Sequence, residues 1–154
     1  MQKTKCFPML AVLLLLTLLT GCGDKTPQTA EGFTEIMEAA DFIVQDVAAD
    51  TETGGTVTTL LIAEGENYEL QFGEFTDSES CKEIYNQSRQ AFNEENPVRT
   101  MSLETSMGNY NYYAFTAGGE FHLVARIDNT MLYCVADVAY RSEIIDFAET
   151  LGYR

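Results

Sequence analysis

Turn-forming dipeptides at regular intervals are the feature of this sequence that most constrains its fold. Gly108-Asn109, Gly118-Gly119 and Asp128-Asn129 separate runs rich in apolar, aromatic and β-branched residues. Tight hairpins favour such dipeptides because their central positions adopt positive φ angles. Connections this short join antiparallel strands, since parallel strands need long crossovers. The chain therefore predicts a four-stranded meander: Val98–Thr105, Tyr110–Ala117, Glu120–Ile127 and Thr130–Val138.

Hydrophobic periodicity predicts the elements that precede and follow this meander. Apolar residues three and four apart indicate helices, and two strand-like runs meet at a hairpin around Gly65. Three amphipathic helices need a surface for their apolar stripes, and we expect one face of the sheet to supply it. The prediction is a two-layer α+β fold with about six antiparallel strands and three helices, in the order α-β-β-α-β-β-β-β-α. The additional elements are helices over Phe33–Ala49, Ser78–Asn93 and Tyr140–Leu151 and strands over Thr56–Ala63 and Tyr68–Phe75.

The N-terminus has the organisation of a secretory signal peptide. Lys3 and Lys5 precede an uninterrupted run of apolar residues and threonine from Met9 to Leu19, and small residues follow that run. As a helix these residues would span roughly 16 Å, at about 1.5 Å per residue. A bilayer core is about 30 Å thick, so the segment is too short for a permanent membrane span.

The end of this leader carries a more specific motif. Leu19-Thr20-Gly21-Cys22 resembles the lipobox of bacterial lipoprotein precursors. The resemblance implies that residues 1–21 are removed and that Cys22 receives a diacylglycerol thioether, which carries two acyl chains such as palmitate. It also implies a location on the extracytoplasmic face of the cell membrane. Two acyl chains give stable anchoring, whereas one binds reversibly. The alternative is a secreted protein with a cysteine near its cleavage site.

The mature chain divides into a tether and one domain. Residues 22–32 are polar and small and predict a lipidated N-terminus with a flexible tether, and residues 33–154 form a single α+β domain. Without Lys3 and Lys5 the chain keeps seven basic residues against 24 acids, a net charge of −17. Such acidity argues against nucleic-acid binding and against attraction to anionic headgroups, so the lipid at Cys22 is the expected membrane contact. Solubility alone also explains an acidic surface.

Motifs typical of catalysis or metal binding are missing from the sequence. It contains no nucleophile elbow, phosphate-binding loop, zinc-binding helix or Cys-x-x-Cys pair, so we predict no enzyme, metal or cofactor. His122 is the single histidine, and strand alternation places it opposite Phe121 and Leu123, on the face we expect to be more exposed. The alternative is an enzyme whose site combines His122 with dispersed acids.

Two cysteines remain once Cys22 is lipidated and the leader is removed. Cys81 lies on the apolar stripe of the second helix, and Cys134 shares a strand face with Leu132 and Ala136. If that helix covers that face, Cys81 and Cys134 could form a disulfide, which the extracytoplasmic location permits. The alternative is two buried thiols that pack as small apolar groups.

Tyrosines form the densest aromatic cluster of the chain. Tyr110 and Tyr112 share one strand face, and we consider them with His122 and Arg126 as a possible partner surface. Cross-strand packing inside the domain is the alternative.

These observations predict a lipid-anchored protein of the cell envelope with a non-catalytic binding or accessory role. Its expected partners are the membrane, through Cys22, and an envelope protein or glycan. An enzyme and a structural spacer are the alternatives. The sequence leaves open the ligand, the oligomeric state and whether the cell has one membrane or two.

Overall fold

The computed structural model describes residues 24–48 and 55–154; the predicted leader over residues 1–21 and Cys22 lie outside them. Within the described residues the chain forms seven strands, three α-helices and one short 3-10 helix. In chain order these are α2 (Ala30–Ala39), β1 (Ile43–Asp46), β2 (Val57–Glu64), β3 (Glu69–Phe75), α3 (Ser78–Glu95), β4 (Thr100–Met107), β5 (Tyr110–Ala117), β6 (Glu120–Ile127), β7 (Thr130–Asp137), η3 (Val138–Tyr140) and α4 (Arg141–Thr150).

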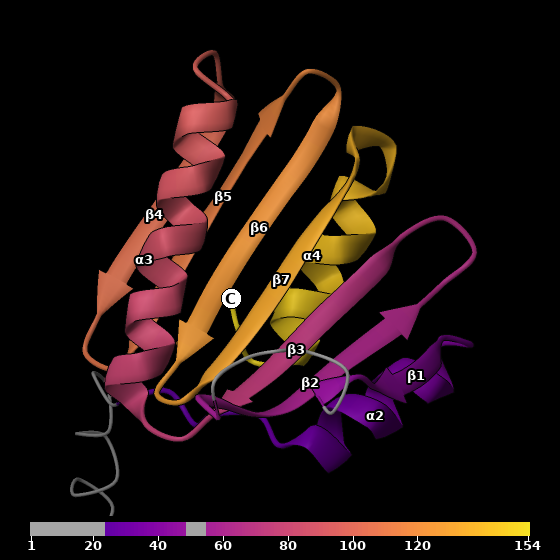
Figure 1. The fold of residues 1–154 in the computed structure, drawn as a ribbon. Helices are drawn as coiled ribbons and strands as arrows, with labels where there is room; N and C mark the ends of the chain where they lie inside the picture. Colours follow the sequence, from indigo (N-terminus) through magenta and orange to yellow (C-terminus); the bar gives the residue numbers. More distant parts are fainter. Residues whose placement is uncertain (1–23, 49–54) are drawn as a thin grey trace, which may run out of the picture.

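All seven strands belong to one antiparallel sheet with the order β1-β2-β3-β7-β6-β5-β4. The predicted meander from β4 to β7 forms one half, and β3 pairs with β7 to join the β1–β3 half to it. Figure 1 shows β7 in the middle of the sheet, with β1 and β4 at its two edges. The α+β class is thereby confirmed.

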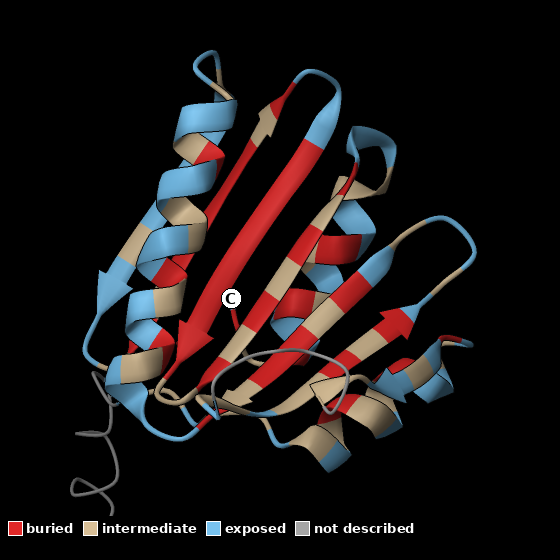
Figure 2. Ribbon diagram, in the orientation of Figure 1, coloured by how far each residue is buried: buried red, intermediate tan, exposed pale blue. Residues whose placement is uncertain are grey.

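The fold has three layers, so the two-layer prediction is wrong. Helix α3 lies on one face of the sheet, and α2 and α4 lie on the other (Figure 1). The central strands explain this arrangement because they are apolar on both faces. Leu123 and Val124 are consecutive residues of β6 with opposite orientations, and both are fully buried. Two separate clusters result, one beneath α2 and α4 and the other beneath α3. Figure 2 shows that the buried residues are concentrated in the central strands.

The first predicted helix is also wrong in its second half. It ends at Ala39, and Asp41 takes a left-handed conformation with φ of 65° that turns the chain toward the sheet. Ile43 and Val44 then pair with β2 as the additional strand β1. β-branched side chains are stiff in helices and pack well on a sheet, so pairing with β2 prevails over the three-and-four spacing.

The other predicted elements are present, each within two residues of its predicted bounds; β4 runs from Thr100 to Met107 and not over Val98–Thr105. Asp77 caps α3 and its carboxylate accepts a hydrogen bond from the Ser80 backbone N–H at 2.8 Å. The hairpin turns contain residues with positive φ, including Gly108 at 52° and Asp128 at 51°. β5 and β6 have the predicted bounds. Among the residues that the structure describes, no helix has both the length and the apolarity needed to cross a bilayer.

Candidate functional site

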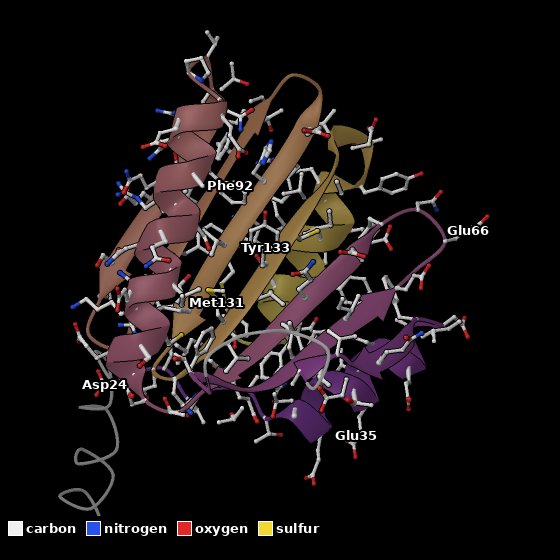
Figure 3. The ribbon with its side chains drawn as sticks, viewed as in Figure 1. Asp24, Glu35, Glu66, Phe92, Met131 and Tyr133 are labelled. Carbon is white, nitrogen blue, oxygen red and sulfur yellow. The ribbon has the colours of Figure 1, made fainter. Side chains whose placement is uncertain are left out.

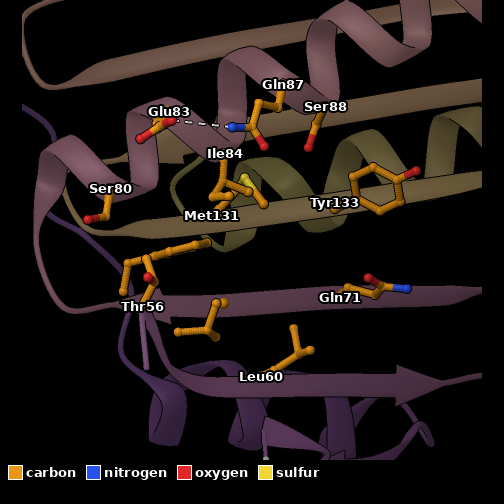
Figure 4. Close-up of a pocket in the computed structure, with 13 residues that line it drawn as sticks. Thr56, Leu60, Gln71, Ser80, Glu83, Ile84, Gln87, Ser88, Met131 and Tyr133 are labelled. Atoms are coloured by element: carbon orange, nitrogen blue, oxygen red, sulfur yellow. Dashed lines mark hydrogen bonds between the residues drawn. The ribbon is translucent and has the colours of Figure 1, made fainter. Parts of the chain in front are cut away.

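Within the described residues, helix α3 covers only part of its own sheet face, and a cleft of about 770 Å³ lies beside it. The cleft runs beside α3, over the inner strands β7, β3 and β2 (Figure 4). Its lining extends along the helix from Ser80 to Ser88, a length of roughly 12 Å at about 1.5 Å per residue. Clefts of about 300–1,000 Å³ are typical of ligand sites.

The floor of the cleft is formed by strand residues whose side chains point toward α3. Leu60 pairs with Gly73, and Gly73 pairs with Met131, so these three form one row across β2, β3 and β7. Tyr133 and Gln71 form the next row. Neighbouring residues on each strand point into the opposite core, as strand alternation requires. Gly73 has no side chain, and the Phe75 ring lies in the space above it: a Cβ added at Gly73 would be 3.1 Å from a carbon of that ring.

The wall of the cleft is one side of α3. Ser80, Glu83, Ile84, Gln87 and Ser88 recur at helical spacing and line the cleft together. The Gln87 Nε2 group donates a long hydrogen bond of 3.4 Å to Glu83 Oε1, as Figure 4 shows. Glu83 is the one formally charged residue among the lining residues that the structure describes. The cleft therefore combines an aliphatic floor with hydroxyl and amide groups, and it suits a neutral or cationic ligand better than an anion.

The possible partner surface of Tyr110, Tyr112, His122 and Arg126 is not exposed, because all four residues are buried, and the alternative of packing inside the domain describes them. Tyr110 and Tyr112 point toward α2 and α4 and belong to the core on that side. His122 and Arg126 point to the opposite face, beneath α3, and each is only 4% exposed. The sheet separates the two pairs, and α3 covers the face that we expected to be exposed.

His122 is enclosed by aromatic rings. Its imidazole stacks on Phe115 with ring centroids 4.5 Å apart and meets the edge of Phe92 at 5.0 Å. Neither ring nitrogen has a hydrogen-bond partner within the described residues, and the nearest carboxylate oxygen, on Glu120, lies 3.7 Å from Nε2. Burial lowers the pKa of His122, against a smaller opposing effect of Glu120 and Glu95. His122 therefore packs as a neutral ring and does not line the cleft.

Arg126 connects the start of α3 to the turns beneath it. Its Nε donates to Asn111 Oδ1 at 2.7 Å, and its Nη1 donates to the Asp128 carbonyl oxygen at 2.8 Å and to Ser78 Oγ at 3.2 Å. A buried guanidinium needs several acceptors, and these contacts provide them. Its role in the described structure is to position α3.

Of the two alternatives for Cys81 and Cys134, the structure shows the second: both are buried free thiols, and they form no disulfide. Cys81 is carried by α3, whereas Cys134 belongs to the core beneath α2 and α4, so the sheet lies between them. A disulfide requires Cα atoms within about 7 Å and converging side chains. Burial raises the pKa of each thiol to about 12.

The cleft itself was not predicted from the sequence. A usable signal existed in β7, where Met131 and Tyr133 on one face and Leu132 and Cys134 on the other are all apolar or aromatic. Such a strand needs cover on both faces, and three helices of modest length leave part of a seven-stranded sheet open.

The described residues contain no group of three or more histidine, cysteine, aspartate or glutamate side chains placed to hold a metal ion. No protein-family model, curated protein or solved structure matches the chain.

Proposed function

We propose that this chain is a lipid-anchored protein of the extracytoplasmic face of the cell membrane and that it works as a non-catalytic binding module. The anchor is Cys22, at the end of the lipobox-like segment Leu19-Thr20-Gly21-Cys22. The ligand occupies the cleft between α3 and strands β2, β3 and β7. The observation that carries this proposal is the cleft beside α3, where the described aliphatic side chains remain partly exposed beside a row of hydrogen-bonding groups.

The chemistry of the lining favours a segment of an envelope protein as the ligand. Leu60, Ile84 and Met131 offer aliphatic surface, whose burial stabilises a complex by about 25 cal/mol per Å² before the costs of association. Gln71 and Gln87 carry amides that can both donate to and accept from a peptide backbone. These groups match a short segment with apolar side chains.

A binding role is also the simplest account of the lining groups. The described lining contains neither histidine nor cysteine, and its ionisable groups are Glu83 and Tyr133. His122, the residue on which the enzymatic alternative depends, is enclosed beneath α3. Arg126, also buried, is engaged in positioning α3.

The anchor is tested by metabolic labelling with palmitate in the organism that expresses the precursor. The native chain should incorporate label and sediment with membranes, and Cys22→Ser should do neither. Cys6→Ser is the matched control, because Cys6 lies within the predicted leader, and it should behave as the native chain. Palmitate on the Cys22→Ser protein would disprove the anchor.

The cleft is tested by photo-crosslinking in intact cells with the full precursor. A photoreactive amino acid at position 87 sits on the cleft wall, whereas at position 86 it sits on the exposed outer side of the same helix. Position 87 should yield a discrete crosslinked partner that position 86 does not. The partner should disappear when Leu60→Glu places a charge in the cleft floor. Identical crosslinks from both positions, or a partner that survives Leu60→Glu, would contradict binding in the cleft.

A further inference from the structure

The chain between the expected anchor and α2 is attached to the domain. Residues 24–29, which we term the anchor strap, precede α2 and were predicted to be part of a flexible tether. The Lys25 backbone N–H donates to Asn109 Oδ1 at 3.0 Å, and Asn109 Nδ2 donates back to the Lys25 carbonyl oxygen at 2.7 Å. This reciprocal pair fixes the strap to the turn between β4 and β5.

The side chain of Lys25 adds a second attachment. Its ammonium group donates to the carbonyl oxygens of Gly152 at 2.9 Å and Arg154 at 3.0 Å, and it lies 4.3 Å from the centre of the Tyr110 ring. Lysine is a good match for this position because its three donors can serve carbonyl oxygens at the end of the chain. The strap is thereby joined to the C-terminal residues as well as to the sheet.

The other end of the strap is fixed where α2 begins. The Ala30 backbone N–H donates to Glu74 Oε1 at 3.1 Å, and Thr59 Oγ1 holds the second oxygen of that carboxylate at 2.9 Å. Thr29 caps the helix by accepting from the Gly32 backbone N–H. A carboxylate at a helix N-terminus is favourable because it meets unpaired N–H groups. The strap therefore runs along one end of the domain with both of its own ends attached.

Four parts of the domain lie at the same end as the strap: the β4–β5 turn, the β6–β7 turn, the C-terminal residues and the Phe75 end of the cleft. Asn109 Nδ2 also donates to Asp128 Oδ2 at 2.8 Å, and Asn129 Nδ2 donates to the carbonyl oxygen of Phe75, which lines the cleft. Figure 3 places Asp24 at this end and Glu66, in the β2–β3 turn, at the opposite end. Strands of eight residues separate the two ends by roughly 26 Å, at about 3.3 Å per residue.

We infer that the anchor strap holds the domain end-on against the membrane, with the β4–β5 and β6–β7 turns toward the bilayer. This inference depends on the proposed lipidation of Cys22. Asp24 is the second residue after Cys22, a span of at most about 7 Å, so a lipid on Cys22 keeps the strap end at the bilayer surface. The strands then stand away from the membrane, and the cleft runs outward from its Phe75 end.

The orientation comes from the strap and not from attraction to headgroups. Asp24 and Asp128 lie at the membrane-facing end and would be repelled by anionic lipids. The domain therefore takes this orientation on any bilayer that accepts the acyl chains, whatever the charge of its headgroups. As a consequence, the cleft is presented to molecules within a few tens of ångströms of the membrane.

The orientation can be tested with one fluorescent label at a time on the lipidated full chain in phosphatidylcholine nanodiscs that contain headgroup nitroxide lipid. Met107→Cys places the label on β4 near the strap, and Glu66→Cys places it at the far end; both side chains are exposed. Native Cys81 and Cys134 are buried, so the dye reacts with the added cysteine. The label at position 107 should be quenched several-fold more strongly than the label at position 66.

Releasing the strap should remove the difference in quenching between the labels at positions 107 and 66. Lys25→Ala combined with Asn109→Ala deletes the attachments at Asn109 and at the C-terminus, and the two labels should then be quenched nearly equally. Asn67→Ala, in the far turn, is the matched control and should leave the difference intact. Urea unfolding verifies that each variant is folded, and Lys25→Ala alone provides a milder release with an intermediate result.

The outcomes separate this inference from the proposed function. Protein that never enters the nanodiscs would overturn the lipid anchor and the orientation together. Protein that enters them with equal quenching at both labels would overturn the orientation alone. A difference that persists in the released double variant would show that something other than the strap orients the domain, which also overturns the inference.

Discussion

The two faces of the sheet differ in how completely they are covered. On the face of α2 and α4, Leu132, Ile144 and Tyr153 are fully buried in one continuous core. On the face of α3, the cluster beneath the helix is smaller, and Met131 and Tyr133 remain partly exposed in the cleft. Both faces carry apolar side chains, so the number of helices and not the composition of the strands determines which face is closed.

This difference in coverage means that one face mainly stabilises the fold, whereas the other can bind a ligand. A closed face excludes water from its apolar side chains, and this burial supplies the main favourable term in folding. A half-open face retains aliphatic surface whose burial becomes available to a ligand. Each prediction below compares a residue of one face with a matched residue of the other, or tests how well a face is closed.

The largest difference is expected between two neighbouring residues of β7. Leu132→Ala removes a fully buried side chain from the closed face and should lower the free energy of unfolding by about 2–5 kcal/mol. Met131→Ala removes a partly exposed side chain from the cleft floor and should cost roughly 1 kcal/mol or less. Urea unfolding of both variants measures the two losses. Equal losses would mean that the α3 face is as closed as the other.

A matched pair of tyrosines should show the same contrast on a smaller scale. The Tyr153 hydroxyl is buried and donates to Thr130 Oγ1 at 2.7 Å, while Thr130 donates onward to the Ile127 carbonyl oxygen. Tyr153→Phe leaves a buried oxygen one donor short and should cost about 1–2 kcal/mol. Tyr133→Phe should stay within about 0.5 kcal/mol, since water reaches this partly exposed side chain. A loss for Tyr133→Phe that equals the loss for Tyr153→Phe would contradict the contrast.

Acidification should test the closure beneath α3 through His122. Burial lowers its pKa in the folded chain, so the unfolded chain takes up a proton first as the pH falls through the ordinary value of about 6.5. Stability should therefore fall with pH in that range, and His122→Phe should reduce this fall. Glu120→Gln should steepen it, because Glu120 favours the protonated imidazole. Chemical unfolding at about pH 7.5 and about pH 5.5 gives the slopes, and identical slopes for the native chain and His122→Phe would contradict the burial.

Much of the fold could be predicted because its signals are local. The turns at Gly108 and Asp128 require positive φ, and the sequence places a glycine and an aspartate there. The cap at Asp77 likewise depends on a few neighbouring residues. The strand β1 was missed because Ile43 and Val44 fit both helical and extended spacing, and pairing with β2, about twenty residues away, decides between them.

The site could not be predicted because it depends on where α3 crosses the sheet. Strand alternation correctly places Tyr110 and Tyr112 on one face of β5, but it cannot tell which face a helix will cover. His122 was expected to be exposed and is enclosed by Phe92, a residue thirty positions earlier in the chain. The cleft exists because α3 packs mainly against β5 and β6, so that among the described residues β2 and part of β3 and β7 lie beside the helix and not beneath it. This is a property of the assembled layers.

The smallest effect is expected in the reactivity of the two free thiols, one of which lies on each side of the sheet. Reduction should leave the mass of the peptides that contain Cys81 and Cys134 unchanged, because these residues lie on opposite sides of the sheet. Maleimide should react with neither thiol in the folded chain, since each is buried and its pKa is raised to about 12. At low urea concentration Cys81 should react before Cys134, because α3 borders the open cleft whereas Cys134 lies in the closed core. Labelling followed by peptide mass spectrometry gives the order. Simultaneous reaction of the two thiols would mean that the two faces open only with global unfolding. A mass gain of two hydrogens on reduction would show that Cys81 and Cys134 form a disulfide after all.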